Sequence, residues 1–132
     1  MAEEGLVTVA SRFSVRETLD RLVAFASQHG LTVFARIDHA DGATKVGMRP
    51  RPTELLIFGH PKGGTPLMQD RQTAGIHLPV KALAWEDADG KVWLTYNAAA
   101  WIAEHHGLGS ASVQAVAAIA AGLAAAMAAA TT

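Results

Sequence analysis

Six histidines are the most reactive side chains in this 132-residue chain, because it contains no cysteine and so no thiolate ligand or nucleophile. Histidine can bind a metal or act as a general acid or base near neutral pH. No pair of them has the HExxH spacing that places two imidazoles on one helix face. His105 and His106 are adjacent, so on a helix they point about 100° apart and cannot bind one ion. The spacing therefore predicts no metal site.

The order of the predicted strands restricts the other histidines further. His60 would end one strand and His77 would begin the next, so a meandering sheet would place both at the same edge. His39 would end the preceding strand and lie at the opposite edge. A three-histidine site is therefore disfavoured within one subunit. A pair of these histidines, or a site shared between two subunits, stays open.

The segment from Gly59 to Thr65 is the strongest candidate for ligand binding. Lys62 supplies a positive charge, and the pair Gly63-Gly64 offers backbone N–H groups of the kind that hold anions. The lysine precedes the glycines, so this is not a Walker loop. The alternative is a turn in which glycine and proline only reverse the chain. We expect a small-molecule site here, with an anion as one candidate ligand, lined by Gly59, His60, Lys62, Gly64 and Thr65.

His39 and Lys81 are two further polar residues that could supply acid–base or electrostatic contacts to this site. The alternatives are that His39 completes a turn after Asp38 and that Lys81 projects into water from an edge strand. Ser14 lies outside any Gly-x-Ser-x-Gly elbow and is better explained as a helix cap. No nucleophile, base and orienting group can be assembled, so we predict no catalytic residue and identify no cofactor, and an enzyme is the least favoured class of function.

One helix is well defined by its local sequence. Ser14 and Glu17 have the capping-box spacing, and Gly30 stands where a left-handed residue would close the helix. The apolar residues between them recur at helical spacing, namely Leu19, Leu22, Val23 and Ala26. These signals predict a helix from about residue 15 to 29.

The other elements follow from apolar runs and turn residues. Strands are predicted at 6–13, 31–37, 54–58, 76–86 and 92–96, with a polar turn at 38–42, a loop at 59–66 and a hairpin turn at 87–90. A short helix is expected at 67–74, another at 98–106 capped by Asn97, and an alanine-rich one at about 111–130. Grouped strands and helices of this kind predict one α+β domain over 1–132, with an antiparallel sheet and helices packed on one face.

Charge and hydropathy limit the partners of the domain. The formal net charge is −1 and no basic stripe is present, so nucleic acid is not an expected partner. The acidic start, Met1 to Gly5, lacks the features of a secretory signal. The run from Val113 to Ala130 approaches the length of a membrane span, but its bulky residues share one stripe: Val116, Ile119, Leu123 and Met127. We therefore expect a cytoplasmic protein without a membrane partner.

Several segments together resemble the DUF302 family, which is named for its unknown function. The resemblance covers about residues 5 to 107 and rests on Gly30 to Ala40, Leu56 to Pro61 with Gly64-Thr65, Leu78 to Lys81, and Trp85 to Asp87. It implies a TBP-like or helix-grip fold with a β-α-β(4)-α layout, and a homodimer. It implies no activity. His60 replaces the asparagine usual in the family's Gly-Asn-Pro turn, and His77 replaces an aspartate that often precedes Leu-Pro.

Two functions are consistent with these observations. In the first, the domain binds a small molecule in a groove beside the segment 59–65. In the second, it is a non-catalytic homodimeric interaction module without a ligand. Trp85 and Trp93 flank one hairpin and are expected either in the core or in a groove between sheet and helix.

Overall fold

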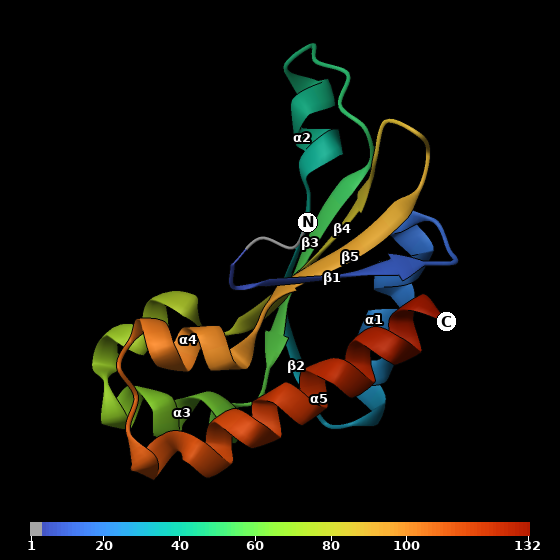
Figure 1. Ribbon diagram of the computed structural model, residues 1–132. Coiled ribbons are helices and arrows are strands. Elements are labelled where there is room, and N and C mark those ends of the chain that lie inside the picture. The colour runs from blue at the N-terminus through green and yellow to red at the C-terminus, as the bar shows by residue number, and fades with distance from the viewer. Residues whose placement is uncertain (1–3) are drawn as a thin grey trace.

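A computed structural model describes residues 4–132, and within them five strands form one antiparallel sheet (Figure 1). The strands lie in the spatial order β1-β5-β4-β3-β2. Their bounds are β1 Leu6–Ser11, β2 Thr32–Asp38, β3 Thr53–Gly59, β4 Val80–Glu86 and β5 Val92–Asn97. Residues 1–3, which belong to the acidic start considered above, lie outside the described residues.

Two long helices pack against each other and cover one face of the sheet (Figure 1). These are α1 (Val15–Gln28) and α5 (Val113–Thr131). The shorter helices are α2 (His39–Lys45), α3 (Pro61–Asp70) and α4 (Ala99–His105), with 3₁₀ turns η1 (Gln72–His77) and η2 (Ser110–Ser112). The predicted α+β class, with helices packed on one face of an antiparallel sheet, is confirmed.

The core lies between the sheet and the helices α1 and α5. Because side chains alternate along a strand, Leu56 and Phe58 of β3 point to the helices, whereas Leu55 and Ile57 point to the other face. The fully buried Leu19 and Leu22 of α1 meet them from the helix side, together with Leu123 and Met127 of α5. The helix-covered face is therefore the buried one.

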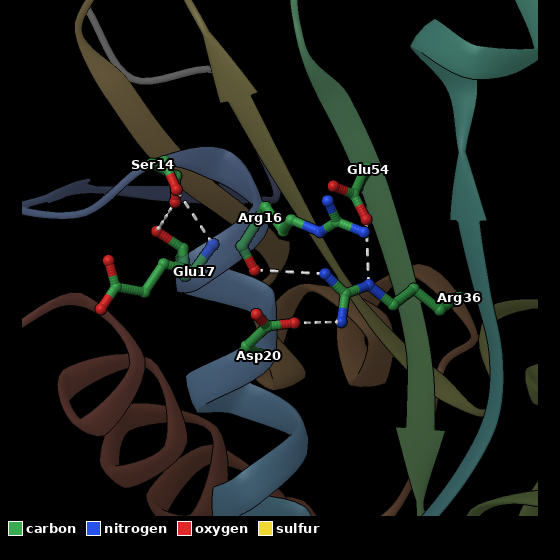
Figure 2. A network of polar contacts seen from close by, with 7 residues as sticks. Ser14, Arg16, Glu17, Asp20, Arg36 and Glu54 are labelled. Atoms are coloured by element: carbon green, nitrogen blue, oxygen red, sulfur yellow. Dashed lines mark hydrogen bonds and ion pairs between the residues drawn. The ribbon is translucent and has the colours of Figure 1, made fainter.

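Helix α1 follows its local signals closely. The Ser14 hydroxyl oxygen accepts a hydrogen bond from the Glu17 amide at 3.1 Å, and Gly30 has φ +68° after the helix end. Figure 2 shows this cap next to the contacts of Arg36. From β2, Arg36 binds Asp20 of α1 at 2.7 Å and Glu54 of β3 at 2.9 Å, so the edge strand is held to the helix layer.

Two segments predicted as turn or loop are helical instead. The predicted loop 59–66 contains the start of α3, where the His60 Nδ1 accepts from the Lys62 amide at 3.0 Å. Pro61 fits the first turn because the missing N–H has no helical partner there. The predicted turn 38–42 contains the start of α2, where the Asp38 carboxylate accepts from the Asp41 amide at 2.8 Å.

Two further boundaries differ from the prediction. The strand expected from Ile76 begins only at Val80, because residues 72–77 form η1. Asn97 closes β5 and does not cap α4, whose N-cap residue is Ala98 without a side-chain hydrogen bond.

Helix α5 combines a membrane-like composition with packing on the body of the domain. The segment Ser110–Thr131 is long and apolar enough to cross a membrane by length and composition. In the fold, however, Leu123, Ala126, Met127 and Ala130 are buried in the core. Of the predicted stripe, Leu123 and Met127 therefore face the core, Ile119 is partly buried against it, and Val116 is half-buried.

Candidate functional site

An apolar groove of about 380 Å³ lies between the end of β3, the first turns of α3 and the middle of α5. The start of β4 forms part of its wall. Apolar side chains contribute most of the lining, which comprises Leu31, Phe34, Phe58, Pro61, Met68, Leu78, Pro79, Val80, Ala118, Ile119 and Leu123. The glycines 59, 63, 64 and 122 complete the wall, and His60 and Thr65 are its two polar residues.

Four of the seven residues predicted to bind a ligand line this groove: Gly59, His60, Gly64 and Thr65. Lys62 is exposed on α3 and does not line it. His39 begins α2 after the last residue of β2, so it lies at the opposite end of the strands from His60, as predicted.

Lys81 also lies outside the groove. It pairs with Ile57 across the strands, so it points to the face of the sheet that is opposite the helices. Its Nζ donates to the Pro79 carbonyl oxygen at 3.3 Å. The groove therefore has neither of the two lysines that the sequence suggested as anion contacts.

Gly63 and Gly64 lie beside apolar side chains of the groove, at distances where an added Cβ atom would make ordinary van der Waals contact. A Cβ atom at Gly64 would lie 3.4 Å from Leu78 Cδ1, and one at Gly63 would lie 3.9 Å from Ile119 Cγ1. Their amides do not form an anion cradle, because both donate to the His60 carbonyl oxygen at 2.9 and 3.3 Å. Gly59 has φ +155°, which favours glycine, at the turn from β3 into α3.

The lining carries no charged residue. Transfer of an ion into such a wall is unfavourable, because no partner replaces its lost hydration. Since the side chains of His60 and Thr65 are exposed, they stand at the rim, where water remains available. The groove is therefore suited chemically to an apolar molecule with at most a few polar atoms at one end.

A cluster of aromatic and imidazole rings lies between η1 and α4, and the sequence reasoning missed it. His77 Nδ1 and His106 Nε2 form a hydrogen bond of 2.7 Å, and His105 stacks on Trp101 with ring centroids 4.7 Å apart. Burial, followed by electrostatic interaction with His106, His105 and Lys81, lowers the pKa of His77 below its usual value. No local sequence pattern predicts this contact, because His77 and His106 are 29 residues apart and only the tertiary fold brings η1 and α4 together.

The same cluster answers the question of the histidine pair at the sheet edge. His60 caps α3 whereas His77 bonds to His106, so the two have different partners. Within residues 4–132 no group of three or more histidine, aspartate or glutamate side chains is arranged to hold a metal ion.

Trp85 and Trp93 lie on the sheet face opposite the helices, neither in the helix-side core nor in the groove. Their neighbours Ala84 and Leu94 are fully buried against the helices, so strand alternation places the two indoles on the other side. Trp85 Nε1 donates to Thr95, and Trp93 Nε1 donates to Asp87, both at 2.9 Å.

The chain is similar in sequence to part of several curated proteins. It is 53% identical over 120 residues to a protein of Brucella suis biovar 1 named fluoride-specific ion channel FluC 1, covering 91% of this chain and 47% of that protein. The protein of the same name from Brucella abortus biovar 1 shares the same identity, with 44% of its length covered. The chain thus spans a little under half the length of these relatives.

The fold also matches a solved structure. The crystal structure of an uncharacterized conserved DUF302 protein from Bacillus stearothermophilus superposes with a TM-score of 0.83, covering 96% of this chain and 98% of that chain at 19% identity. At this identity the likeness establishes the fold alone. The model of the domain of unknown function DUF302 matches residues 7–130, nearly the whole chain. The chain therefore belongs to the DUF302 family.

Proposed function

We propose that this domain binds a small, mostly apolar molecule in the groove between β3, α3 and α5. The supporting observation is the groove itself, which has a volume of about 380 Å³ and no charged side chain in its lining. Small-molecule sites are generally apolar clefts of about 300–1,000 Å³ with a few polar groups that fix orientation. His60 and Thr65 would supply those polar groups at the rim.

The proposed ligand is neutral in its buried part. An anionic ligand was one candidate from the sequence, but Lys62, Lys81 and His39 do not line the groove. A charged group would therefore have to remain at the rim, in water. A neutral ligand with the same apolar part should bind at least as well as an acidic one.

Thermal unfolding with 1-octanol and with octanoate tests this proposal. Both carry an eight-carbon chain, and they differ in the charge of the head group. Binding to the folded state alone should stabilise the protein by about 1.4 kcal/mol at about ten times the dissociation constant. We expect octanol to raise the unfolding midpoint at least as much as octanoate.

Gly122 provides a matched pair of variants, because it lines the groove and a Cβ atom there would meet nothing within 4 Å. Gly122→Leu would add a bulky apolar side chain to the groove wall, and its Cβ atom would meet no atom within 4 Å. Gly122→Ala gives a similar gain in helix propensity, about 1 kcal/mol, and leaves the groove open. Octanol should stabilise the alanine variant and not the leucine variant. Equal stabilisation of both variants, or none of the unmodified protein, would exclude the groove as the site.

We also propose that the domain acts together with a fluoride channel. Its support is the 53% identity to part of two proteins named as such, in which the matching region is joined to a further region of similar length. Fluoride itself is not the expected ligand of the groove, because the lining has no cation to replace its hydration.

This second proposal predicts a physical association. The part of the Brucella suis relative outside the match should co-purify with this chain when the two are co-expressed, and fluoride tolerance of the cells should differ from that with either part alone. Absence of co-purification together with unchanged tolerance would contradict it. The octanol experiment does not depend on this outcome.

A further inference from the structure

The tip segment, residues 45–52 between α2 and β3, combines exposed apolar side chains with positive charge. Val46 is 74% exposed and Met48 is 64% exposed. The same segment contains Lys45, Arg49 and Arg51 and no acidic residue. Large apolar side chains that are grouped at one point of the surface mark a place where a partner binds. The cations beside them indicate that the partner is negatively charged.

A defined turn presents the two apolar side chains. The Gly47 amide donates to the Thr44 carbonyl oxygen at 3.1 Å. The Met48 amide donates to the Ala43 carbonyl oxygen at 3.0 Å. These bonds form the Schellman pattern that ends a helix, and Gly47 has the left-handed φ of +83° that the pattern requires. The backbone therefore holds Val46 and Met48 in water without any burial of their side chains.

The tip segment projects from the body of the domain. Figure 1 shows α2 and the chain that follows it beyond the end of the sheet, on the side away from α3, α4 and α5. No residue of α2 is buried. The turn between β4 and β5, which carries Asp87 and Asp89, lies at the same end of the sheet but does not reach as far (Figure 1). A flat surface would therefore meet the tip segment first.

The two arginines of the tip segment are available to an anion. Within residues 4–132 neither of them forms an ion pair, whereas Lys45 pairs with Asp41 at 3.1 Å. The Arg51 Nε donates to the backbone carbonyl oxygen of Glu86 at 3.2 Å, and its terminal nitrogens remain for other partners. A proline follows each arginine, so the backbone is restricted to extended conformations at both positions.

A polar hollow of about 330 Å³ lies beside the tip segment. It is lined by Arg49, Pro50, Arg51, Thr53, Trp85 and Glu86. Its two guanidinium groups outnumber its single carboxylate, and guanidinium groups bind phosphate oxygens with two parallel hydrogen bonds. The hollow therefore suits the phosphate of an anionic head group, next to the exposed apolar pair.

We propose that the tip segment docks on a bilayer that contains anionic phospholipid. Val46 and Met48 would enter the interface, and Arg49 and Arg51 would bind head-group phosphates. An apolar contact or a few cations alone give only marginal membrane binding, whereas the two signals together are sufficient. The segment supplies both within eight residues.

The shape of the tip favours a bilayer over a peptide or a nucleic acid. Val46 and Met48 line neither the groove nor the polar hollow, so they do not form a concave wall that could hold a side chain of a peptide. A nucleic-acid backbone would leave both apolar side chains in water. A bilayer accepts projecting apolar side chains without a complementary shape.

This proposal rests on neither function proposed above. The tip segment precedes β3 and the groove lies at the end of β3, so the octanol and membrane experiments can fail separately. The sequence-based expectation of no membrane partner rested on the charge of the whole chain and on the segment of α5. Neither describes the local composition of residues 45–52.

Co-sedimentation with vesicles tests the docking. The protein should sediment with vesicles of phosphatidylcholine and phosphatidylglycerol at low salt, and much less with phosphatidylcholine alone. Arg49→Gln and Arg51→Gln should each lower the lipid partition coefficient about fivefold. Arg71→Gln is the matched control, because it changes the net charge equally at an exposed position at the end of α3. It should change the partition coefficient little.

A fluorescent label tests the insertion, because the chain has no cysteine of its own. The dye NBD on Met48→Cys should emit at shorter wavelength and with higher intensity when anionic vesicles are added. The same dye on Ile76→Cys, at a position in η1 that is 76% exposed, should not respond. Equal sedimentation with both kinds of vesicle, an equal loss in Arg71→Gln, or a response at position 76 and not at 48 would overturn the proposal.

Discussion

Asp70 connects two segments that are about 40 residues apart in the chain. Its carboxylate accepts from the Ser112 hydroxyl at 2.6 Å and from the Gly109 amide at 2.8 Å. These two hydrogen bonds lower the pKa of Asp70 below its usual value, the Ser112 bond most. The contact fixes the end of α3 to the start of α5, and both helices form the groove.

The lowered pKa of Asp70 predicts a pH dependence. A carboxyl whose pKa is lower in the folded state stabilises the fold above its unfolded pKa, about 3.9, and this stabilisation is lost as pH falls through the folded pKa. Asp70→Asn should lower the free energy of unfolding at pH 7 and flatten its decline in acid. Urea unfolding across a pH series measures both effects. If the free energy of unfolding of Asp70→Asn and of the unmodified protein changed with pH in the same way, Asp70 would not contribute to the pH dependence of stability.

His77 gives a prediction at higher pH. Its pKa is lowered mainly by burial and then by His106, His105 and Lys81, so the folded state favours the neutral imidazole. The unfolded chain therefore binds more protons, and stability should fall as pH drops below about 6.5. His77→Asn keeps a donor near His106 but does not titrate, so its stability should fall less between pH 7 and 5. His39→Asn, at an exposed position, serves as the control and should follow the unmodified protein.

At the scale of single elements, the cap of α1 has a measurable effect. Ser14 accepts a hydrogen bond from the Glu17 amide, so Ser14→Ala should destabilise the protein by about 0.5–2 kcal/mol. Ser14→Asp should restore most of the loss, because a carboxylate accepts the same hydrogen bond. Ser27→Ala, at an exposed position in the last turn of α1, should change stability little. Chemical unfolding of the three variants tests whether the cap is used as the sequence indicated.

The success with α1 and the failure with α3 have a common physical explanation. The signals for α1 are local, namely a cap, an apolar stripe and a closing glycine, and each contributes on its own. The first turns of α3 contain Gly63, Gly64 and Pro66, which lower helix propensity. There, the helix packs through the buried Leu67 and lies beside Leu78 and Ile119, and these packing partners cannot be read from neighbouring residues.

The candidate site was predictable in place but not in chemistry. The unusual glycine and histidine content of 59–65 marked the segment, and four of its residues line the groove. An anion was a candidate ligand because the glycine amides were expected to be free, whereas the amides of Gly63 and Gly64 donate to the His60 carbonyl oxygen. The apolar wall comes from Phe34, Leu78 and Ile119, which are distant in sequence and have no motif.

At the scale of the whole molecule, the long-range arrangement decides which surfaces are free. β1 joins β5 across more than 80 residues, as in the pair Thr8 and Thr95, and so forms the edge opposite β2. The alternation of the strands shows which side chains share a face, but only the packing of α1 and α5 on one face shows that Trp85 and Trp93 lie away from the helices. The same strand order makes β1 and β2 the two edge strands of the sheet.

The alanine-rich helix α5 raises the question of membrane insertion at this scale, because its composition would allow it to span a bilayer. In the fold Ala126 is 1% exposed and Ala124 lies on the exposed side of the same helix. If α5 packs as observed, Ala124→Glu should leave solubility and the unfolding midpoint unchanged, since the carboxylate stays in water. Ala126→Glu should be strongly destabilising, because it buries an unpaired charge. In a bilayer a charged side chain at position 124 would instead cost about 2.5–3.5 kcal/mol of insertion free energy. A lower unfolding midpoint of Ala124→Glu, or a lower yield of this variant from the membrane fraction, would therefore indicate that lipid or another protein covers this face of α5.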